Sequence, residues 1–396
     1  MRYRTPSPQF TTLIANNIRY WQETVTQPDH LQKEQQNVYQ SIDMGLQVAA
    51  TMPTATDLLL ELSPFIEAHG YWRAWIPLLE KSIAAHADTA KRWDLQIQLA
   101  FFLSKSGENE TAVSLLNNLL TKPLDTTQQG RVHYHLGSSY FWQQQYDEAR
   151  SHTRNALAIF TNHPEVAIGG TAPALNLLGV IHLRTGDYAA AIPLFIEARE
   201  KWQQRTQYDY VLTTFLNEGL ARSSSGQTEA AMACYQEAMP LLKTHGNLLN
   251  KARILLNLGS LYASQEKWNE AEATYLLADR NALYQQGHLN LYAQFITSLG
   301  YVVMEMGELK TAVSHTTEAI AIWQQLGDGL MEANALENLG DTHHHLGDIP
   351  SACTSYQNGI NLARKHPNDL FAQQLQQILA DKLNTLSKGE NGARDG

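Results

Sequence analysis

Residues 258–278 read LGSLYASQEKWNEAEATYLLA, and the pattern of this stretch recurs along most of the chain. Its glycine, Gly259, is followed twelve residues later by an alanine, Ala271. Six glycines spaced 42, 40, 40, 41 and 40 residues apart share this relation: Gly137, Gly179, Gly219, Gly259, Gly300 and Gly340. Their alanines are Ala149, Ala191, Ala231, Ala271, Ala312 and Ala352. A fixed period of this length is typical of a solenoid, in which each unit buries its apolar face against its neighbours.

Each repeat reads as two helices joined by a tight turn. Leu336, Leu339 and Leu346 recur at helical spacing. Gly347 then suits a helix C-terminus, and Asp348 suits the cap of the next helix. The same break recurs at Gly107, Gly186, Gly226 and Gly307. No segment alternates with the period of a strand over a useful length, so the sequence predicts an all-α fold.

The six repeated glycines lie inside predicted helices, where each costs about 1 kcal/mol relative to alanine. A cost that recurs six times requires an offsetting gain. We expect that gain to be a close approach of the paired helix, with the alanine twelve residues on as the other half of the contact.

This order of residues resembles the tetratricopeptide repeat. Leu258-Gly259, Trp268, Ala271 and Ala278 match the family's glycine, aromatic and small positions in order. The repeats that begin at Leu136-Gly137 and Leu178-Gly179 match as well. The resemblance covers residues 52–366 and implies a right-handed α-solenoid, the TPR superhelix, of about eight helix hairpins.

The ends of the chain differ from the repeats. Residues 1–51 are predicted to be an N-terminal helical segment, and residues 367–386 a capping helix with Leu375, Leu379 and Leu383 on its apolar face. Residues 387–396 are predicted to be a disordered tail.

The period of 40–42 residues exceeds the 34 that are usual for the family. Long repeats of this kind resemble the sensor arms of STAND regulators. The stretch from Leu31 to Leu46 resembles the helix that often precedes their repeats, and Leu62 to Glu80 resembles their first repeat. The chain has no Gly-Lys dipeptide and hence no P-loop, so the arm is expected without the ATPase domain.

Composition limits the partners. The formal net charge of −10 argues against a broad nucleic-acid surface. No stretch approaches 18 uninterrupted apolar residues, so no membrane span is expected. The two cysteines, Cys234 and Cys353, form no disulfide framework, and we expect a cytoplasmic protein.

The resemblance also implies a site. In this family the first helices of all repeats line a concave groove. The positions expected to face that groove, and therefore the predicted ligand site, are Arg131, His135, Ser138, Trp142, Asn176, Arg184, Asn217, Arg253, Asn257, Ser260, Gln294, Tyr301, Asn334 and Asn338. Further readings of the same positions are Ser224, Ser264, Ser298, Glu305, Asp341 and His345.

Asparagine recurs near the repeat glycine at Asn176, Asn217, Asn257 and Asn338. An amide both donates and accepts, so a row of amides can hold a peptide backbone regardless of its sequence. The alternative is a hydrogen bond between helices that only supports the repeat, and the sequence leaves both open. Arg131, Arg184 and Arg253 favour acidic groups, and Trp142 is the best candidate for an anchor.

Two other groups of residues could have either a functional or a purely structural role. Asp341 and His345 share a helix face and form the best metal candidate, but His343 occupies a core position and one helix cannot aim three consecutive histidines at one ion. A structural role is the stronger interpretation. In the fifth hairpin, Glu218 replaces an expected leucine and Arg222 lies four residues on. This pair predicts either a weaker junction or a rotation that exposes both side chains.

No catalytic motif holds up, so we expect no enzyme, no cofactor and no bound metal. The leading hypothesis is a protein- or peptide-binding module, as the sensor or adaptor arm of a regulatory complex with a separate ATPase or effector. The alternative is an assembly scaffold that acts through its convex face or through oligomerisation. A metal-binding enzyme is the remote alternative.

Overall fold

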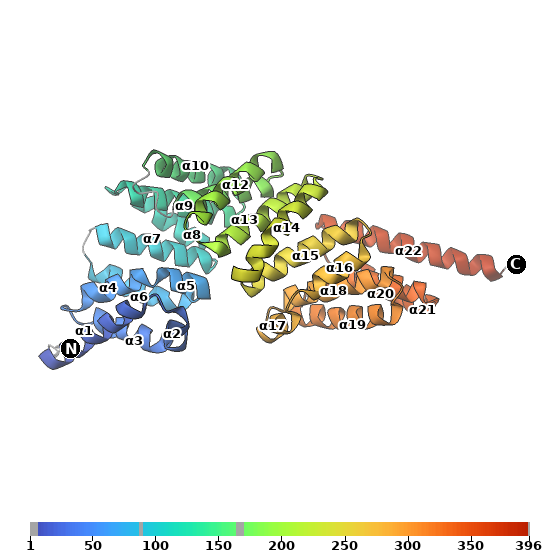
Figure 1. Ribbon diagram of the computed structural model, residues 1–396, viewed down its shortest axis with the longest axis horizontal. Helices are drawn as coiled ribbons and strands as arrows, with labels where there is room; N and C mark the ends of the chain where they lie inside the picture. The colour runs from blue at the N-terminus through green and yellow to red at the C-terminus, as the bar shows by residue number, and fades with distance from the viewer. Residues whose placement is uncertain (1–6, 87–89, 164–169, 395–396) are drawn as a thin grey trace. The chain divides into compact units, whose positions relative to one another are not determined.

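The computed structural model describes residues 7–86, 90–163 and 170–394, and it is built from α-helices without a strand in those ranges (Figure 1). The chain divides into two compact units, Met1–Lys201 and Trp202–Gly396. Within each unit, helices that are consecutive in the sequence pack against one another. The predicted all-α hairpin fold is confirmed.

The first unit begins with short helices and continues as hairpins. Its helices are α1 (Pro8–Thr24), α2 (Pro28–Lys33), α3 (Gln35–Leu46), α4 (Met52–Glu61), α5 (Ser63–His69), α6 (Trp72–Ala85), α7 (Ala90–Lys105), α8 (Asn109–Leu119), α9 (Thr126–Trp142), α10 (Tyr146–Asn162), α11 (Thr171–Arg184) and α12 (Tyr188–Gln203). The first four hairpins are α4–α5 with α6, α7 with α8, α9 with α10, and α11 with α12.

The second unit holds four further hairpins and a long terminal helix. Its helices are α13 (Tyr208–Ser224), α14 (Thr228–His245), α15 (Leu248–Ser264), α16 (Trp268–Leu276), α17 (Arg280–Gln285), α18 (Leu289–Glu305), α19 (Leu309–Leu326), α20 (Gly329–His345), α21 (Ile349–Ala363) and α22 (Leu370–Arg394). The pairs are α13 with α14, α15 with α16, α18 with α19, and α20 with α21, and α22 packs on α21.

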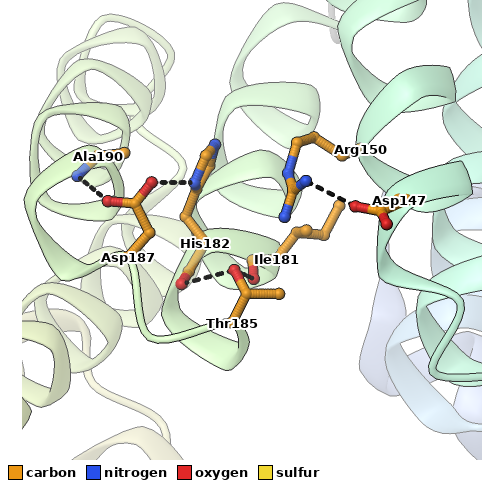
Figure 2. Close-up of polar contacts among 7 residues, drawn as sticks. All are labelled: Asp147, Arg150, Ile181, His182, Thr185, Asp187 and Ala190. Atoms are coloured by element: carbon orange, nitrogen blue, oxygen red, sulfur yellow. Dashed lines mark hydrogen bonds and ion pairs between the residues drawn. The ribbon is translucent and has the colours of Figure 1, made fainter.

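The turn between α11 and α12 shows how a Gly-Asp pair closes a hairpin (Figure 2). Gly186 has φ of +79°, a left-handed conformation that glycine adopts at little cost. Asp187 then caps α12, because its Oδ1 accepts from Ala190 N at 3.2 Å while its Oδ2 lies 3.0 Å from His182 Nδ1. Asp348 repeats the arrangement before α21, where it accepts from Ser351 N at 3.2 Å. The predicted Gly-Asp breaks are therefore capped turns.

The repeated glycines do sit in close contacts, but the nearest atoms do not belong to the expected alanine. Only at Gly137 does the alanine take part, because an added Cβ would lie 3.2 Å from Ala149 O. A Cβ added to Gly259 would lie 2.3 Å from the ring of Tyr275, and one added to Gly300 would lie 2.6 Å from Thr316 Oγ1. The residue sixteen positions after the glycine occupies this place in all six hairpins: Thr153, Phe195, Tyr235, Tyr275, Thr316 and Tyr356. The alanines are fully buried, one helical turn earlier. The correction follows from helix geometry, since the crossing point lies a turn beyond the alanine.

The fifth hairpin keeps its ion pair inside. Arg222 Nε donates to Glu218 Oε1 at 2.7 Å, and Glu218 is only 3% exposed. A rotation that exposes the pair is therefore excluded. A weaker junction at this hairpin stays a prediction, which uniform amide-exchange protection across the fourth to sixth hairpins, α11 to α16, would contradict.

The terminal helix is longer than predicted. Helix α22 continues past residue 386 to Arg394, at odds with a disordered tail over 387–396. Residues 395 and 396 of that predicted tail lie outside the described residues. Leu375 and Leu379 are buried against α21, as expected of a cap.

Candidate functional site

The first helices of the second unit lie next to one another and form one surface. Helix α15 contacts α13 and α18, and α18 contacts α20. The predicted groove residues of this unit lie on these four helices, and none of them is buried: Asn217, Arg253, Asn257, Ser260, Gln294, Tyr301, Asn334 and Asn338. Most of them line two hollows that follow one another along α15 and α18.

The first hollow has a volume of about 630 Å³, and leucines dominate its wall. We call it the leucine hollow. Its leucines are Leu216, Leu220, Leu249, Leu256, Leu289, Leu291 and Leu326. Predicted groove residues Arg253, Asn257 and Gln294 also line it. Sequence reasoning found these polar residues but missed the leucines, which come from four helices. Only Leu216 and Leu256 share a repeat position, three residues before the repeat glycine.

The polar groups of the leucine hollow differ in how far they are engaged. Asn257 Nδ2 donates to Tyr235 Oη at 3.1 Å, and Gln294 Nε2 donates to Asn290 Oδ1 at 2.5 Å. Arg253 is exposed and makes no ion pair within the described part of the chain. The supporting role considered for the asparagines is thus observed for Asn257, whereas the Arg253 guanidinium is available at an apolar wall.

The second hollow has a volume of about 580 Å³ and a polar wall. We call it the acidic hollow because it contains the carboxylates Glu305, Glu337 and Asp341. The predicted residues Ser260, Tyr301, Asn334 and Asn338 line it as well, together with Ser264 and Ser298. The repeat positions read from the sequence therefore do converge in space at this place.

Lys382 supplies the acidic hollow with a cation from α22. Its Nζ donates to Glu337 Oε1 at 2.7 Å and to Asp341 Oδ2 at 2.6 Å. Burial alone lowers the pKa of Lys382, but the hydrogen bonds to Asp341 and Glu337 and their negative charges raise it above its ordinary value. Sequence reasoning missed this residue because it treated α22 only as a cap. The signal was its spacing from Leu375 and Leu379, which places Lys382 on the same face.

Tyrosines of the second helices extend their hydroxyl groups to residues that line the two hollows. Tyr356 Oη donates to Asp341 Oδ1 at 2.7 Å, and Tyr275 Oη lies 3.1 Å from Ser260 Oγ. Burial raises the pKa of Tyr235, Tyr275 and Tyr356, so all three hydroxyls stay protonated at neutral pH. The repeated glycine makes room for each ring. It thereby delivers a hydroxyl to the residues that line the groove, a role the sequence did not suggest.

Asp341 and His345, the candidate metal ligands, do not form a metal site. The Asp341 carboxylate binds Tyr356 and Lys382, and His345 is exposed on the last turn of α20. His343 is half-buried with Nδ1 3.7 Å from Asp348 Oδ2. Across the described ranges, no three His, Cys, Asp or Glu side chains gather where they could hold an ion.

The predicted residues of the first unit have different surroundings. Arg131 Nη1 bonds Asp94 Oδ1 at 2.9 Å, so its charge is already paired within the chain. His135 packs on Phe101 with ring centroids 5.2 Å apart. Burial, then the charges of Arg131 and Lys105, lower the pKa of His135 to about 3, which keeps the ring neutral. Trp142 is 58% exposed, as its predicted role requires.

The other first-unit positions stay predictions as ligand residues. Ser138 and Asn176 are half-buried, and Arg184 is exposed at the end of α11. None of the helices in the described ranges is both long and apolar enough to cross a lipid bilayer.

The fold defines an all-helical repeat protein, and comparison with known families identifies the repeat. Family models described as tetratricopeptide repeat match residues 134–205, 170–244, 254–278 and 292–365. Together these matches cover more than half of the chain. The chain belongs to the tetratricopeptide repeat family.

Solved structures share the fold at low sequence identity. A STAND protein with a tetratricopeptide repeat sensor from Pyrococcus horikoshii aligns with a TM-score of 0.64 and 12% identity, over 88% of this chain and 55% of that one. Aspartyl phosphate phosphatase F from Bacillus subtilis aligns with 0.55 and 13%, over 93% and 97%. The apo quorum sensor NprR from B. thuringiensis aligns with 0.54 and 14%, over 78% and 97%. No curated protein matches the sequence significantly.

Proposed function

We propose that this protein binds a peptide segment in the groove of its second unit, with the leucine hollow as the main contact. The observation that carries the proposal is the position of Arg253, an exposed guanidinium at the edge of a leucine-lined hollow. Apolar wall and cation together suit a bulky aliphatic side chain that has a carboxylate nearby. The amides of Asn257 and Gln294 stand beside it and can bond the peptide backbone.

The acidic hollow extends this surface along α15 and α18. Ser260, which lines it, lies one helical turn from Asn257, which lines the leucine hollow. A peptide that enters the leucine hollow can therefore continue across serine and asparagine side chains. Within the first unit, Trp142, Asn176 and Arg184 are proposed as ligand residues of that unit alone.

Two comparisons support a regulatory setting. The neighbour from Pyrococcus horikoshii is described as carrying its tetratricopeptide repeats as a sensor, and a Rap protein of the same fold was solved in complex with the Competence and Sporulation Factor, at a TM-score of 0.51 and 12% identity. We propose that this chain acts without catalysis, as the sensor or adaptor arm of a complex that includes a separate ATPase or effector.

Selection from a random linear peptide library tests the proposal. Enriched peptides are resynthesised with a fluorescent label, and their Kd for the full chain is measured by anisotropy. We expect Arg253→Ala to weaken binding about tenfold and Leu220→Glu, which places a charge in the hollow, to abolish it. Both side chains are exposed, so both variants should fold.

A matched control separates a local from a general charge effect. Arg154→Ala removes an exposed arginine from α10, a second helix of the first unit, and should leave Kd unchanged. Failure to enrich any peptide contradicts the proposal. Enriched peptides whose Kd is the same in wild type, Arg253→Ala and Leu220→Glu contradict it equally, and favour a scaffold that uses another face.

A further inference from the structure

One second helix of the second unit is interrupted, and the interruption creates a separate hollow. Helix α16 ends at Leu276, and α17 begins at Arg280. Asp279 Oδ1 accepts from Ala282 N at 3.0 Å, so α17 has its own N-cap. The hairpins on either side have continuous second helices, α14 and α19. The break is therefore built into the sequence of this hairpin and is not a property of the repeat.

The break also changes the surface. Leu276 and Leu277 are 53% and 54% exposed. The corresponding positions, five and six residues after the repeat alanine, hold Gln236-Glu237 in α14 and Thr317-Glu318 in α19. Of these three hairpins, only the one with the broken helix has two exposed leucines where the others have polar residues. An apolar surface at this place needs a reason other than packing within the repeat.

Beside the break lies a hollow of about 400 Å³ with aromatic and carboxylate walls. Asn281, Tyr284 and Gln285 of α17 line it, together with Tyr292 of α18 and Glu318 and Gln325 of α19. The rings of Tyr284 and Tyr292 lie 5.3 Å apart at an interplanar angle of 64°. The edge of one ring therefore packs against the face of the other, and both tyrosines line the hollow.

Glu318 gives the hollow its charge. It is the one ionisable acid or base, besides the tyrosines, among the described residues that line the hollow. Tyr292 Oη donates to Glu318 Oε1 at 2.5 Å, which fixes the carboxylate next to the rings. Burial, the hydrogen bond to Glu318 and its charge raise the pKa of Tyr292 to about 12, so the phenol stays neutral and keeps donating.

From this arrangement we infer a binding site for an organic ammonium group. Tyrosine faces attract a cation through the ring quadrupole, and a fixed carboxylate adds a charge of opposite sign. A small polarisable ammonium head fills such a space better than an anion or an uncharged group. The site lies outside the leucine and acidic hollows, and its ligand is independent of the peptide proposed for the groove.

The ammonium can come from a free quaternary amine or from a lysine side chain of a bound protein. Both present the same chemistry to the rings. The probes are choline, its uncharged carbon isostere 3,3-dimethylbutan-1-ol, and the amides of lysine and trimethyl-lysine. Ligand-observed NMR titrations of the full chain give each Kd. Tighter binding of choline than of both amides indicates a free amine, and tighter binding of an amide indicates a side chain, and either supports the site.

We expect choline to bind at least about tenfold more tightly than its isostere, because the two differ in charge alone. Tyr284→Leu and Glu318→Gln should each weaken choline binding by about tenfold. Tyr284 is 53% exposed, so its replacement should not unfold the hairpin. Arg280→Gln should tighten binding, since the Arg280 charge reaches Tyr292 and opposes a cation in the hollow.

Glu237→Gln is the matched control. Glu237 holds the same repeat position in α14 as Glu318 holds in α19 and is exposed, but it does not line the hollow of Tyr284 and Tyr292. Its replacement should leave choline binding unchanged. The inference is overturned if the isostere binds as tightly as choline, if no ammonium binds, or if Tyr284→Leu and Glu318→Gln both leave the Kd unchanged.

Discussion

The sixth and seventh hairpins stand side by side and solve the same packing problem differently. In α15–α16 the space over Gly259 is filled by Tyr275, and in α18–α19 the space over Gly300 is filled by Thr316. Tyr275 carries its hydroxyl through to Ser260 and the acidic hollow. Thr316 Oγ1 is buried against Gly300 of α18 and has no hydrogen-bond partner. The same glycine therefore delivers a polar group to the groove in one hairpin and only closes the core in the other.

The largest effect should come from filling the space above Tyr275. Gly259→Leu is expected to destabilise the protein by about 3 kcal/mol, the upper range for overpacking. The ring of Tyr275 cannot move aside, because it is 1% exposed and Phe295 packs edge-on against it at 6.0 Å. Urea unfolding measures the change in the free energy of unfolding.

The seventh hairpin provides the control for this prediction. Gly300→Ala meets the single atom Thr316 Oγ1, and alanine gains about 1 kcal/mol in helix propensity, which offsets part of that contact, so Gly300→Ala should destabilise less than Gly259→Ala. Gly259→Ala meets a rigid ring instead and should destabilise. Equal effects of the two alanine variants would show that the residue opposite the glycine does not matter.

An intermediate effect should follow from removing one hydroxyl. Tyr356→Phe is expected to cost about 2 kcal/mol, because its hydroxyl donates to the charged Asp341 carboxylate. Tyr275→Phe removes a bond to a neutral serine hydroxyl and should cost about 1 kcal/mol. Phe195 fills the same place over Gly179 in the fourth hairpin, so the ring alone is compatible with the fold. Calorimetric melting distinguishes the two, and a larger loss for Tyr275→Phe would contradict the assigned partners.

How far the sequence predicted this molecule depends on the range of each interaction. The hairpins follow from Gly, Asp and Ala spacing because turns and helix pairs are local, and the Gly186-Asp187 turn is as expected. The partner of each glycine was missed because it depends on the angle at which two helices cross. The leucine hollow was missed because leucines of four helices meet there. The repeat period does not predict that these side chains come together.

The acidic hollow shows the same limit from the other side. Its serines and asparagines were predicted from the repeat, since each hairpin presents the same positions to the groove. Lys382 was not, because α22 lies outside the repeats and its charge enters the groove only through tertiary packing. Arg131 was predicted to be available for a ligand, yet Asp94 on a neighbouring helix pairs with it.

The smallest effect, and the sharpest test of the eighth hairpin, concerns that lysine. Lys382→Met should cost about 0.5 kcal/mol at neutral pH, since the side chain is one-third exposed and solvent screens its two ion pairs. The folded protein raises the pKa of Lys382, so its contribution is complete below the unfolded value of about 10.4 and is lost as pH rises through the folded value. The difference in melting temperature between wild type and Lys382→Met should therefore be constant near neutral pH and disappear in strong base. A difference that persists there would mean that the charge of Lys382 is not the source of the effect and that Asp341 is held by the tyrosine alone.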